Sequence, residues 1–165
     1  MSRTFFGVYR GTVENNVDPM TRGRVQVSVP AVLGDGRLAW AEPCVPYAGS
    51  QVGTFAVPPV GASAWVQFEG GDPDYPVLMG CFWGDGESPA PGLPQVLMFA
   101  TDGVTVTASG VPGGGGLTIE VGSPAVAVPI TLSLGPTGIE LSTGASKITL
   151  DGAKVSINDG ALDVI

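Results

Sequence analysis

Residues 130–165 read ITLSLGPTGIELSTGASKITLDGAKVSINDGALDVI, and this stretch says most about the architecture. Apolar residues recur two apart, as in Ile130-Thr-Leu132-Ser-Leu134, with small or polar residues between them. Successive units start nine, nine, seven and seven residues apart, and glycines such as Gly135 and Gly144 lie between them. A spacing of two is the period of a β-strand, so the pattern predicts an irregular internal repeat of very short strands joined by tight corners.

One such strand cannot bury its own apolar face, so the repeat needs neighbours stacked on it. Phe99 is the only aromatic residue after residue 94, which leaves nothing to fill a wide single-chain solenoid. We therefore expect an intertwined trimeric β-helix, a β-prism in which three chains each supply one wall and strands hydrogen-bond to different subunits. A plain β-sandwich or a stack of hairpins is the alternative. The expected trimer core consists of the alternating apolar residues Ile130, Leu132, Ile139, Leu141, Ile148, Leu150, Val155, Ile157, Leu162 and Val164.

Residues 84–94, GDGESPAPGLP, are dense in chain breakers and are predicted to be a linker between domains 1–83 and 95–165. All tryptophans, tyrosines and cysteines precede this linker. Turn signals such as Gly34-Asp-Gly36 separate five apolar stretches there, a number and length typical of an OB-fold barrel. The expected strands are Phe5–Val13, Arg24–Val29, Leu38–Val45, Ala62–Glu69 and Tyr75–Trp83.

The composition favours an all-β protein of short strands. Among 165 residues there are 26 glycines and 15 prolines, yet 44% of the residues are hydrophobic. No stretch keeps a helical period, none is long and apolar enough to span a bilayer, and no secretory signal is visible. The net charge of −8 disfavours partners that are nucleic acids or anionic membrane surfaces. We expect protein partners.

Side chains for catalysis are scarce. The chain contains no histidine, which excludes Ser-His and Cys-His relays and His-rich zinc sites. The carboxylate pairs Asp72/Asp74 and Asp85/Glu87 lie in turn sequences, where Asp is favoured for its hydrogen bonds to the backbone. Gly113–Gly116 lacks the lysine and helix of a phosphate-binding loop and is expected to be a flexible corner. We predict no enzyme activity, no cofactor and no metal site.

The cysteines and tryptophans have structural interpretations. Cys44 and Cys81 are far apart in a chain with no visible signal for export, and we expect buried thiols in preference to a disulfide. In an acidic protein, the three tryptophans are expected to pack in the core or at interfaces in preference to stacking on bases; they are Trp40, Trp65 and Trp83.

Several ordered motifs resemble a known family. GTVENNVDPMTRGRVQVSVP at residues 11–30, PPVG at 58–61, WVQFEGGDP at 65–73 and YPVLMG at 75–80 resemble phage baseplate assembly protein V and the related spike proteins of type VI secretion. The ending from Ile139 onward resembles the β-prism of that family. The resemblance implies a homotrimer with an OB-fold collar and a C-terminal needle, docked to a tail hub protein and acting as the cell-puncturing tip of a contractile tail.

The departures from the family pattern refine this expectation. Residues 84–94 are too short to hold a lysozyme-like insertion, and no hub region precedes the OB part, so we expect a separate hub chain. Some relatives end in a His-x-His iron site, which a chain without histidine cannot form. We expect instead that a small tip-sharpening protein contacts Val164 and Ile165. The protein would be made and assembled in the host cytoplasm, would reside in a virion baseplate or extracellular injection particle, and would contact membrane only transiently on piercing.

Two rival functions stay open at this point. A polysaccharide-active β-helical enzyme of the tailspike kind would need a carboxylate cluster on a wide groove. A receptor-binding adhesin module would be expected to carry a larger head domain after the shaft.

Overall fold

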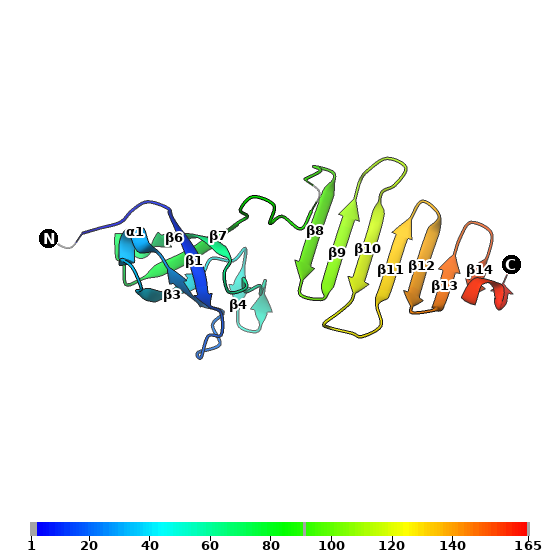
Figure 1. Ribbon diagram of the computed structural model, residues 1–165, viewed down its shortest axis with the longest axis horizontal. Coiled ribbons are helices and arrows are strands. Elements are labelled where there is room, and N and C mark those ends of the chain that lie inside the picture. Colours follow the sequence, from blue (N-terminus) through cyan, green and yellow to red (C-terminus); the bar gives the residue numbers. More distant parts are fainter. Residues whose placement is uncertain (1–2, 91, 165) are drawn as a thin grey trace. The chain divides into compact units, whose positions relative to one another are not determined.

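The computed structural model describes residues 3–90 and 92–164, and the chain divides into two units between Glu87 and Ser88. Nearly all regular structure is β (Figure 1). The prediction of an all-β protein with an N-terminal OB-type barrel is confirmed. None of the described residues forms a helix long and apolar enough to cross a membrane.

The first unit is a closed five-stranded barrel in the order β1-β2-β3-β7-β6. Four of its contacts are antiparallel, and the barrel closes through a short parallel contact in which Glu42 lies opposite Val77. The five predicted strands are all present, each slightly shorter than its apolar stretch. Their bounds are β1 Tyr9–Asn15, β2 Val25–Ser28, β3 Leu38–Pro43, β6 Ser63–Phe68 and β7 Pro76–Phe82.

The barrel interior is filled by every second residue of these strands. On β6 the residues alternate between half-buried and buried, with Ala64, Val66 and Phe68 pointing inward. Gly11 on β1 has no room for a larger side chain, because a Cβ there would lie 2.8 Å from the carbonyl oxygen of Ser28. The hydrophobic core consists of Val13, Val25, Val27, Val29, Leu33, Ala41, Ala64, Val66, Phe68 and Leu78.

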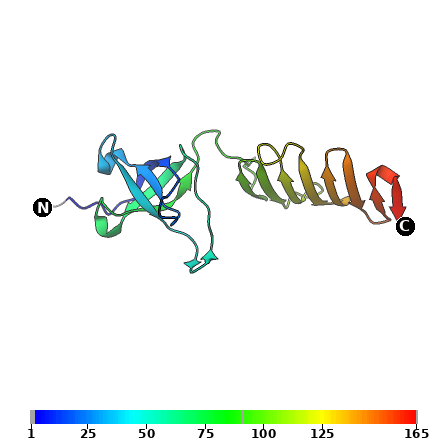
Figure 2. The ribbon, with the colours of Figure 1, turned by 90° about the horizontal axis from the view of Figure 1, so that it is seen from below.

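Three elements of this unit were not predicted. A short helix, α1 (Pro30–Leu33), begins with proline and buries Leu33, and one turn is too short to show a helical period. A 3-10 turn, η1, covers Glu69–Gly71. Between β3 and β6 the chain forms an excursion, residues 44–57, that carries the two-residue strands β4 (Ala48–Gly49) and β5 (Val52–Gly53). We call this excursion the arm, and Figure 2 shows it projecting from the barrel.

The second unit is one antiparallel sheet whose eight strands follow chain order from β8 to β15. Figure 2 shows it as a single layer. The strands are β8 Val96–Thr101, β9 Val104–Ser109, β10 Gly116–Val121, β11 Ile130–Gly135, β12 Gly138–Thr143, β13 Ser146–Leu150, β14 Val155–Ile157 and β15 Leu162–Val164, with the 3-10 turn η2 at Asn158–Gly160. With strands about 4.7 Å apart, seven spacings give this sheet a height of about 33 Å.

The strand pairing corrects one expectation. Strands β9 to β14 pair on both edges with strands of their own chain, so they do not hydrogen-bond to different subunits as predicted. The short corners cause this, because a tight turn returns the chain beside the strand it has just left. Each chain therefore builds a complete wall.

Candidate functional site

The strand register places the alternating apolar residues of the second unit on one face, which we call the inner face. Leu132 lies opposite Ile119 and Leu141, and Ile148 lies opposite Leu141 and Ile157. These residues belong to a column that runs from Phe99 on β8 to Leu162 on β15. A second column of the inner face contains Leu97, Ala108, Leu117, Leu134, Ile139, Leu150, Val155 and Val164.

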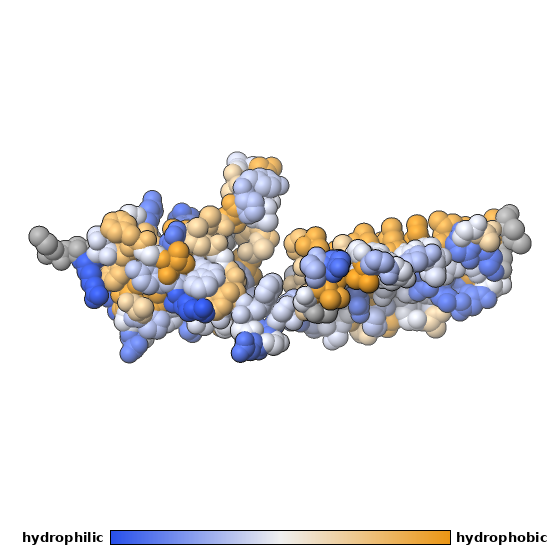
Figure 3. All heavy atoms as spheres, turned by 90° about the horizontal axis from the view of Figure 1, so that it is seen from above, coloured by the Kyte–Doolittle hydropathy of each residue, from blue (hydrophilic) through white to orange (hydrophobic). Residues whose placement is uncertain are grey.

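No described residue of the second unit packs over the inner face. All buried hydrophobic residues among those described belong to the barrel. In the second unit Leu141 is 48% exposed, Ile148 is 45% exposed and Phe99 is 66% exposed. Figure 3 shows the hydrophobic side chains of this unit as a regular row along one side. A continuous exposed apolar face of this length marks an association surface.

The opposite, outer face is polar over most of its length. Cross-strand pairs such as Thr118 with Ser133 and Thr149 with Ser156 line it. Lys147 pairs with Asp159 at 2.6 Å, and its backbone N–H donates to Asn158 Oδ1 at 2.9 Å. The hydrogen bond to Asp159 raises the pKa of Lys147. A sheet with one apolar and one polar face is built to be covered on one side only.

The inner face narrows toward the C-terminus. Strands β8 to β12 have six residues, β13 has five, and β14 and β15 have three each. A third apolar column, with Val121 and Ile130, becomes polar at Thr143 and Ser146. The sheet has a recess of about 350 Å³ there, lined by Ile130, Leu141, Ile148 and Ile157 among others.

All ten residues predicted for a trimer core lie on the inner face. The last of them, Val164, is 60% exposed, whereas Ile165 lies outside the described residues. Sequence reasoning missed the base of this face, namely Leu97, Phe99, Val104 and Val106. For Leu97 and Phe99 the signal was the apolar run Val96-Leu-Met-Phe-Ala100, but a continuous run does not show which face each residue occupies. For Val104 and Val106 the signal was the alternation in Val104-Thr-Val-Thr-Ala108, which was overlooked.

The loop between β1 and β2 is organised by one carboxylate. Asp18 accepts hydrogen bonds from the backbone N–H groups of Met20 and Arg22, and from Arg24 Nη2 at 2.8 Å and Nε at 3.2 Å. The bonds from Arg24 hold the pKa of Asp18 well below its ordinary value, although burial acts in the opposite direction. The Arg24 guanidinium in turn lies 5.2 Å from the ring centroid of Trp40. The DPMTRGR stretch therefore builds a rigid loop.

The predicted turn carboxylates behave as turn residues. Asp72 accepts a hydrogen bond from the backbone N–H of Asp74 at 3.0 Å, and Glu87 accepts one from Gly84 at 2.6 Å. Gly113 lies with positive φ in the connection between β9 and β10. Across residues 3–90 and 92–164, no group of three or more His, Cys, Asp or Glu side chains is placed to hold a metal.

The predicted burial of the two cysteines is wrong. Cys44 and Cys81 are free and exposed, because Cys44 lies just past the end of β3 and Cys81 lies next to the last residue of β7, opposite Ala64. Partial desolvation raises the pKa of Cys81. The tryptophans differ from one another: Trp40 and Trp65 are half-buried against arginines, whereas Trp83 is 67% exposed.

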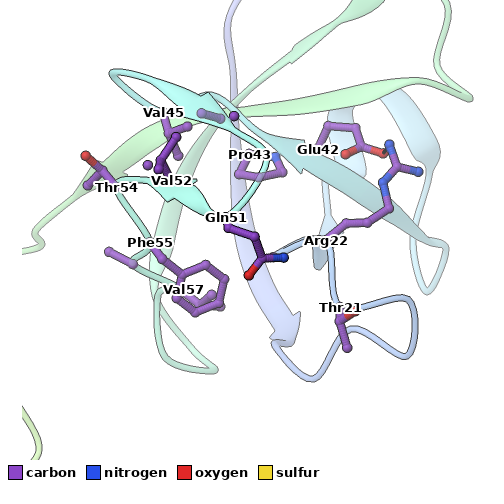
Figure 4. A pocket seen from close by; sticks show the side chains of 15 residues that line it. Thr21, Arg22, Glu42, Pro43, Val45, Gln51, Val52, Thr54, Phe55 and Val57 are labelled. Atoms are coloured by element: carbon purple, nitrogen blue, oxygen red, sulfur yellow. Dashed lines mark ion pairs between the residues drawn. The ribbon is translucent and has the colours of Figure 1, made fainter.

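The arm forms one side of a groove on the barrel. The cavity of about 630 Å³ lies between the arm and the Thr21–Gly23 segment, with Pro43 on its floor (Figure 4). Arg22 and Glu42 form an ion pair of 2.7 Å beside it. Phe55 on the arm is 80% exposed, and a Cβ placed on Gly23 would lie 3.1 Å from its ring.

Comparison with known proteins covers both units. Residues 9–83 match the model of the type VI secretion system and phage-baseplate injector OB domain. Residues 95–163 match the model of the phage baseplate V C-terminal trimerisation domain. A search of curated proteins gives no match.

Proposed function

Because the chain belongs to the family of phage baseplate V proteins and type VI secretion spikes, we propose that it forms the trimeric central spike of a contractile injection system. The observation that carries the proposal is the inner face, which extends over eight strands and is left uncovered by the described residues of its own unit. Three such walls facing one axis cover one another and leave three polar outer faces to solvent. The ten predicted core residues would then meet around the axis.

The proposed action of the spike is mechanical. In a prism of three walls, the hydrogen-bond ladders of each sheet run along the axis and the strands lie across it. Axial load is then carried by seven successive strand pairings per wall, while side chains hold the walls together. The height of about 33 Å is comparable to the hydrocarbon thickness of a bilayer, about 30 Å. Piercing would require no covalent bond to be broken.

The barrel is the proposed collar that docks to a separate hub protein. The strand register places the end of β6 beside the start of β7 at one end of the barrel. Strand β7 finishes at the opposite end, where the linker begins. Phe6 (76% exposed) and Tyr75 (62% exposed) lie at the end away from the linker. Exposed aromatic side chains are enriched in protein interfaces, so we place the hub there. The narrow end of the shaft, at Val164, would carry the tip protein.

A chain truncated after Glu87 tests whether binding to the hub and puncture of the target cell depend on different units. The collar keeps its closed barrel and core, so particles assembled with it should bind the hub and contract. Without a shaft they should not permeabilise target cells, measured as potassium efflux. Full-length Ser142→Asp, altered on the outer face, serves as the matched control and should permeabilise normally. Permeabilisation by the truncated particles at the control level would refute the puncturing role.

A further inference from the structure

One end of the collar carries a concentration of exposed apolar side chains. It is the end at which β7 finishes and the linker to the shaft leaves. The loops there expose Val17 (75%), Met20 (61%) and Val60 (58%), which we call the loop cluster. The arm starts from β3 at the same end and exposes Tyr47 (61%), Val52 (65%) and Phe55 (80%), the arm cluster. Single exposed apolar residues are ordinary, but six at one end of a small barrel indicate an interface.

The loop cluster is held in a fixed conformation. Asn15 Oδ1 accepts a hydrogen bond from the N–H of Val17, and Asp18 Oδ1 accepts one from the N–H of Met20, both at 3.0 Å. Asn16 Nδ2 donates to the carbonyl of Pro58 at 3.1 Å, which ties this loop to the segment that carries Val60. Apolar side chains on a backbone fixed in this way form a preorganised surface, which lowers the entropic cost of binding.

The arm, by contrast, has little support of its own. Its two strands pair only through Ala48 with Gly53 and Gly49 with Val52. Beside them, the backbone N–H of Thr54 donates a hydrogen bond to the backbone carbonyl of Tyr47 at 3.3 Å. A two-stranded hairpin is marginally stable at best in water without a surface to pack on. The base of the arm is held on its own collar, by the N–H of Cys44 on the carbonyl of Leu78 at 3.0 Å and by Val57 against the core, so a partner surface would stabilise the hairpin at its tip.

The connection to the shaft identifies that partner as a second copy of the chain. Thirteen residues separate the end of β7 at Phe82 from the start of β8 at Val96, a reach of at most about 45 Å. A trimerisation domain thus tethers three collars to one shaft base, each by the end that carries both clusters. Short tethers raise the effective concentration of one collar at the next to the millimolar range, enough to populate a weak apolar contact.

We propose that the arm cluster of each collar packs on the loop cluster of the next copy, so that three arms close a ring of collars. Threefold contacts are heterologous and need two different, complementary surfaces on each copy, as these two clusters provide. Neither cluster contains a charged side chain, and neighbouring Arg22 is paired with Glu42. The inference rests on the proposed trimer, and the hub is left to the opposite end of the barrel.

Hydrogen–deuterium exchange on the purified full-length chain tests the ring, since no hub is present. Exchange of the amides of residues 46–56 is compared between the wild type and Leu141→Asp, which should be monomeric with an intact collar. We expect arm exchange at least about tenfold slower in the trimer, as a docked segment opens rarely. Equal exchange in trimer and monomer would overturn the ring alone, as would protection that appears only after hub is added. A monomeric wild type, seen in its mass, would overturn the trimeric spike as well.

A second variant tests the pairing of the two clusters. Phe55→Ser should leave the trimer mass unchanged but accelerate exchange at residues 16–20, because the loop cluster loses its cover from the neighbouring arm; residues 21–23 are left out because they lie against Phe55 of the same collar. Thr54→Ser, one residue away and exposed, is the matched control and should have no effect. If Phe55→Ser changes exchange only within the arm, the loop cluster is not its partner and the proposed pairing is wrong.

Discussion

Replacing Leu141 by aspartate tests the inner face most directly. Leu141 lies on β12 in the middle of the inner face, between Leu132 and Ile148, and is 48% exposed in the single chain. Full burial of a leucine side chain is worth about 1.5–3 kcal/mol, so the half that association still covers contributes about 1 kcal/mol per chain. An uncompensated buried charge costs about 3–5 kcal/mol. Over three chains the total is about 10 kcal/mol or more, a loss of roughly seven powers of ten in the association constant.

The matched control is Ser142→Asp on the same strand. Ser142 points to the outer face and lies opposite Lys147, so its replacement adds a solvated charge beside a cation. Native mass spectrometry and light scattering at micromolar concentration should give three times 16.7 kDa for the wild type and Ser142→Asp, and 16.7 kDa for Leu141→Asp. A trimeric Leu141→Asp, or dissociation of both variants alike, would refute the assignment of the inner face.

The Leu141→Asp variant should also regain its trimer in acid. Assembly would bury the introduced carboxyl group and raise its pKa above the ordinary value of about 3.9. The ionisation penalty is therefore complete above the raised pKa and disappears as the pH falls below about 3.9. Light scattering across pH 3 to 8 measures this recovery, with Leu141→Asn, which carries no titratable group, as the control whose mass should not follow pH in this way.

Three further predictions concern other parts of the chain. Gly138→Ala should destabilise the shaft by about 1–3 kcal/mol, because Gly138 has φ +125° and a Cβ there would clash with the carbonyl of Leu150. Thermal unfolding measures the loss, and the control is Gly135→Ala, where a Cβ would make only an ordinary contact with the carbonyl oxygen of Gly115 at 3.9 Å. Asp18→Asn should lower the melting temperature of the collar at neutral pH, followed by tryptophan fluorescence. Because the pKa of Asp18 is lowered in the folded state, the stability that its carboxylate contributes is present above about pH 3.9 and is lost as the pH falls toward the folded-state pKa. The difference in melting temperature between Asp18→Asn and the wild type should therefore disappear in acid. Asp35→Asn, in an exposed turn, is the control and should melt at the wild-type temperature. Deleting residues 161–165 should abolish capture of a co-expressed tip protein while trimer mass and hub binding persist, and undiminished capture would show that the tip protein binds elsewhere.

The alternation of apolar and polar residues within single strands was enough to predict the inner face. Features that depend on contacts between residues distant in the sequence could not be predicted in this way. Alternation from Ile130 to Val164 places each apolar residue on the inner face because every corner is short enough to keep neighbouring strands in chain order. The apolar run at β8 has no such alternation, so its inner-face residues were missed, whereas the alternation of β9 was present in the sequence and was overlooked. The closure of the barrel, in which β3 pairs with β7, joins residues more than thirty positions apart and leaves no periodic signal.

The arm and the cysteines show a second limit of sequence reasoning. Strands β4 and β5 have two residues each, fewer than any alternation needs to become visible. Cys44 and Cys81 were assigned from the general tendency of free cysteine to be buried. Their exposure follows from their positions at the ends of β3 and β7, which composition does not reveal.

The meander order of the shaft also determines how its length can change during evolution. Each strand pairs with the strand before it and the strand after it, so removing or adding one hairpin leaves every remaining pair intact. A hairpin adds two spacings, about 9.5 Å, and returns the chain to the same side of the wall. A single added strand would instead bring the chain out at the opposite side and move every later corner across the wall. Shafts of this design should therefore differ in length by whole hairpins, in steps of about 9.5 Å.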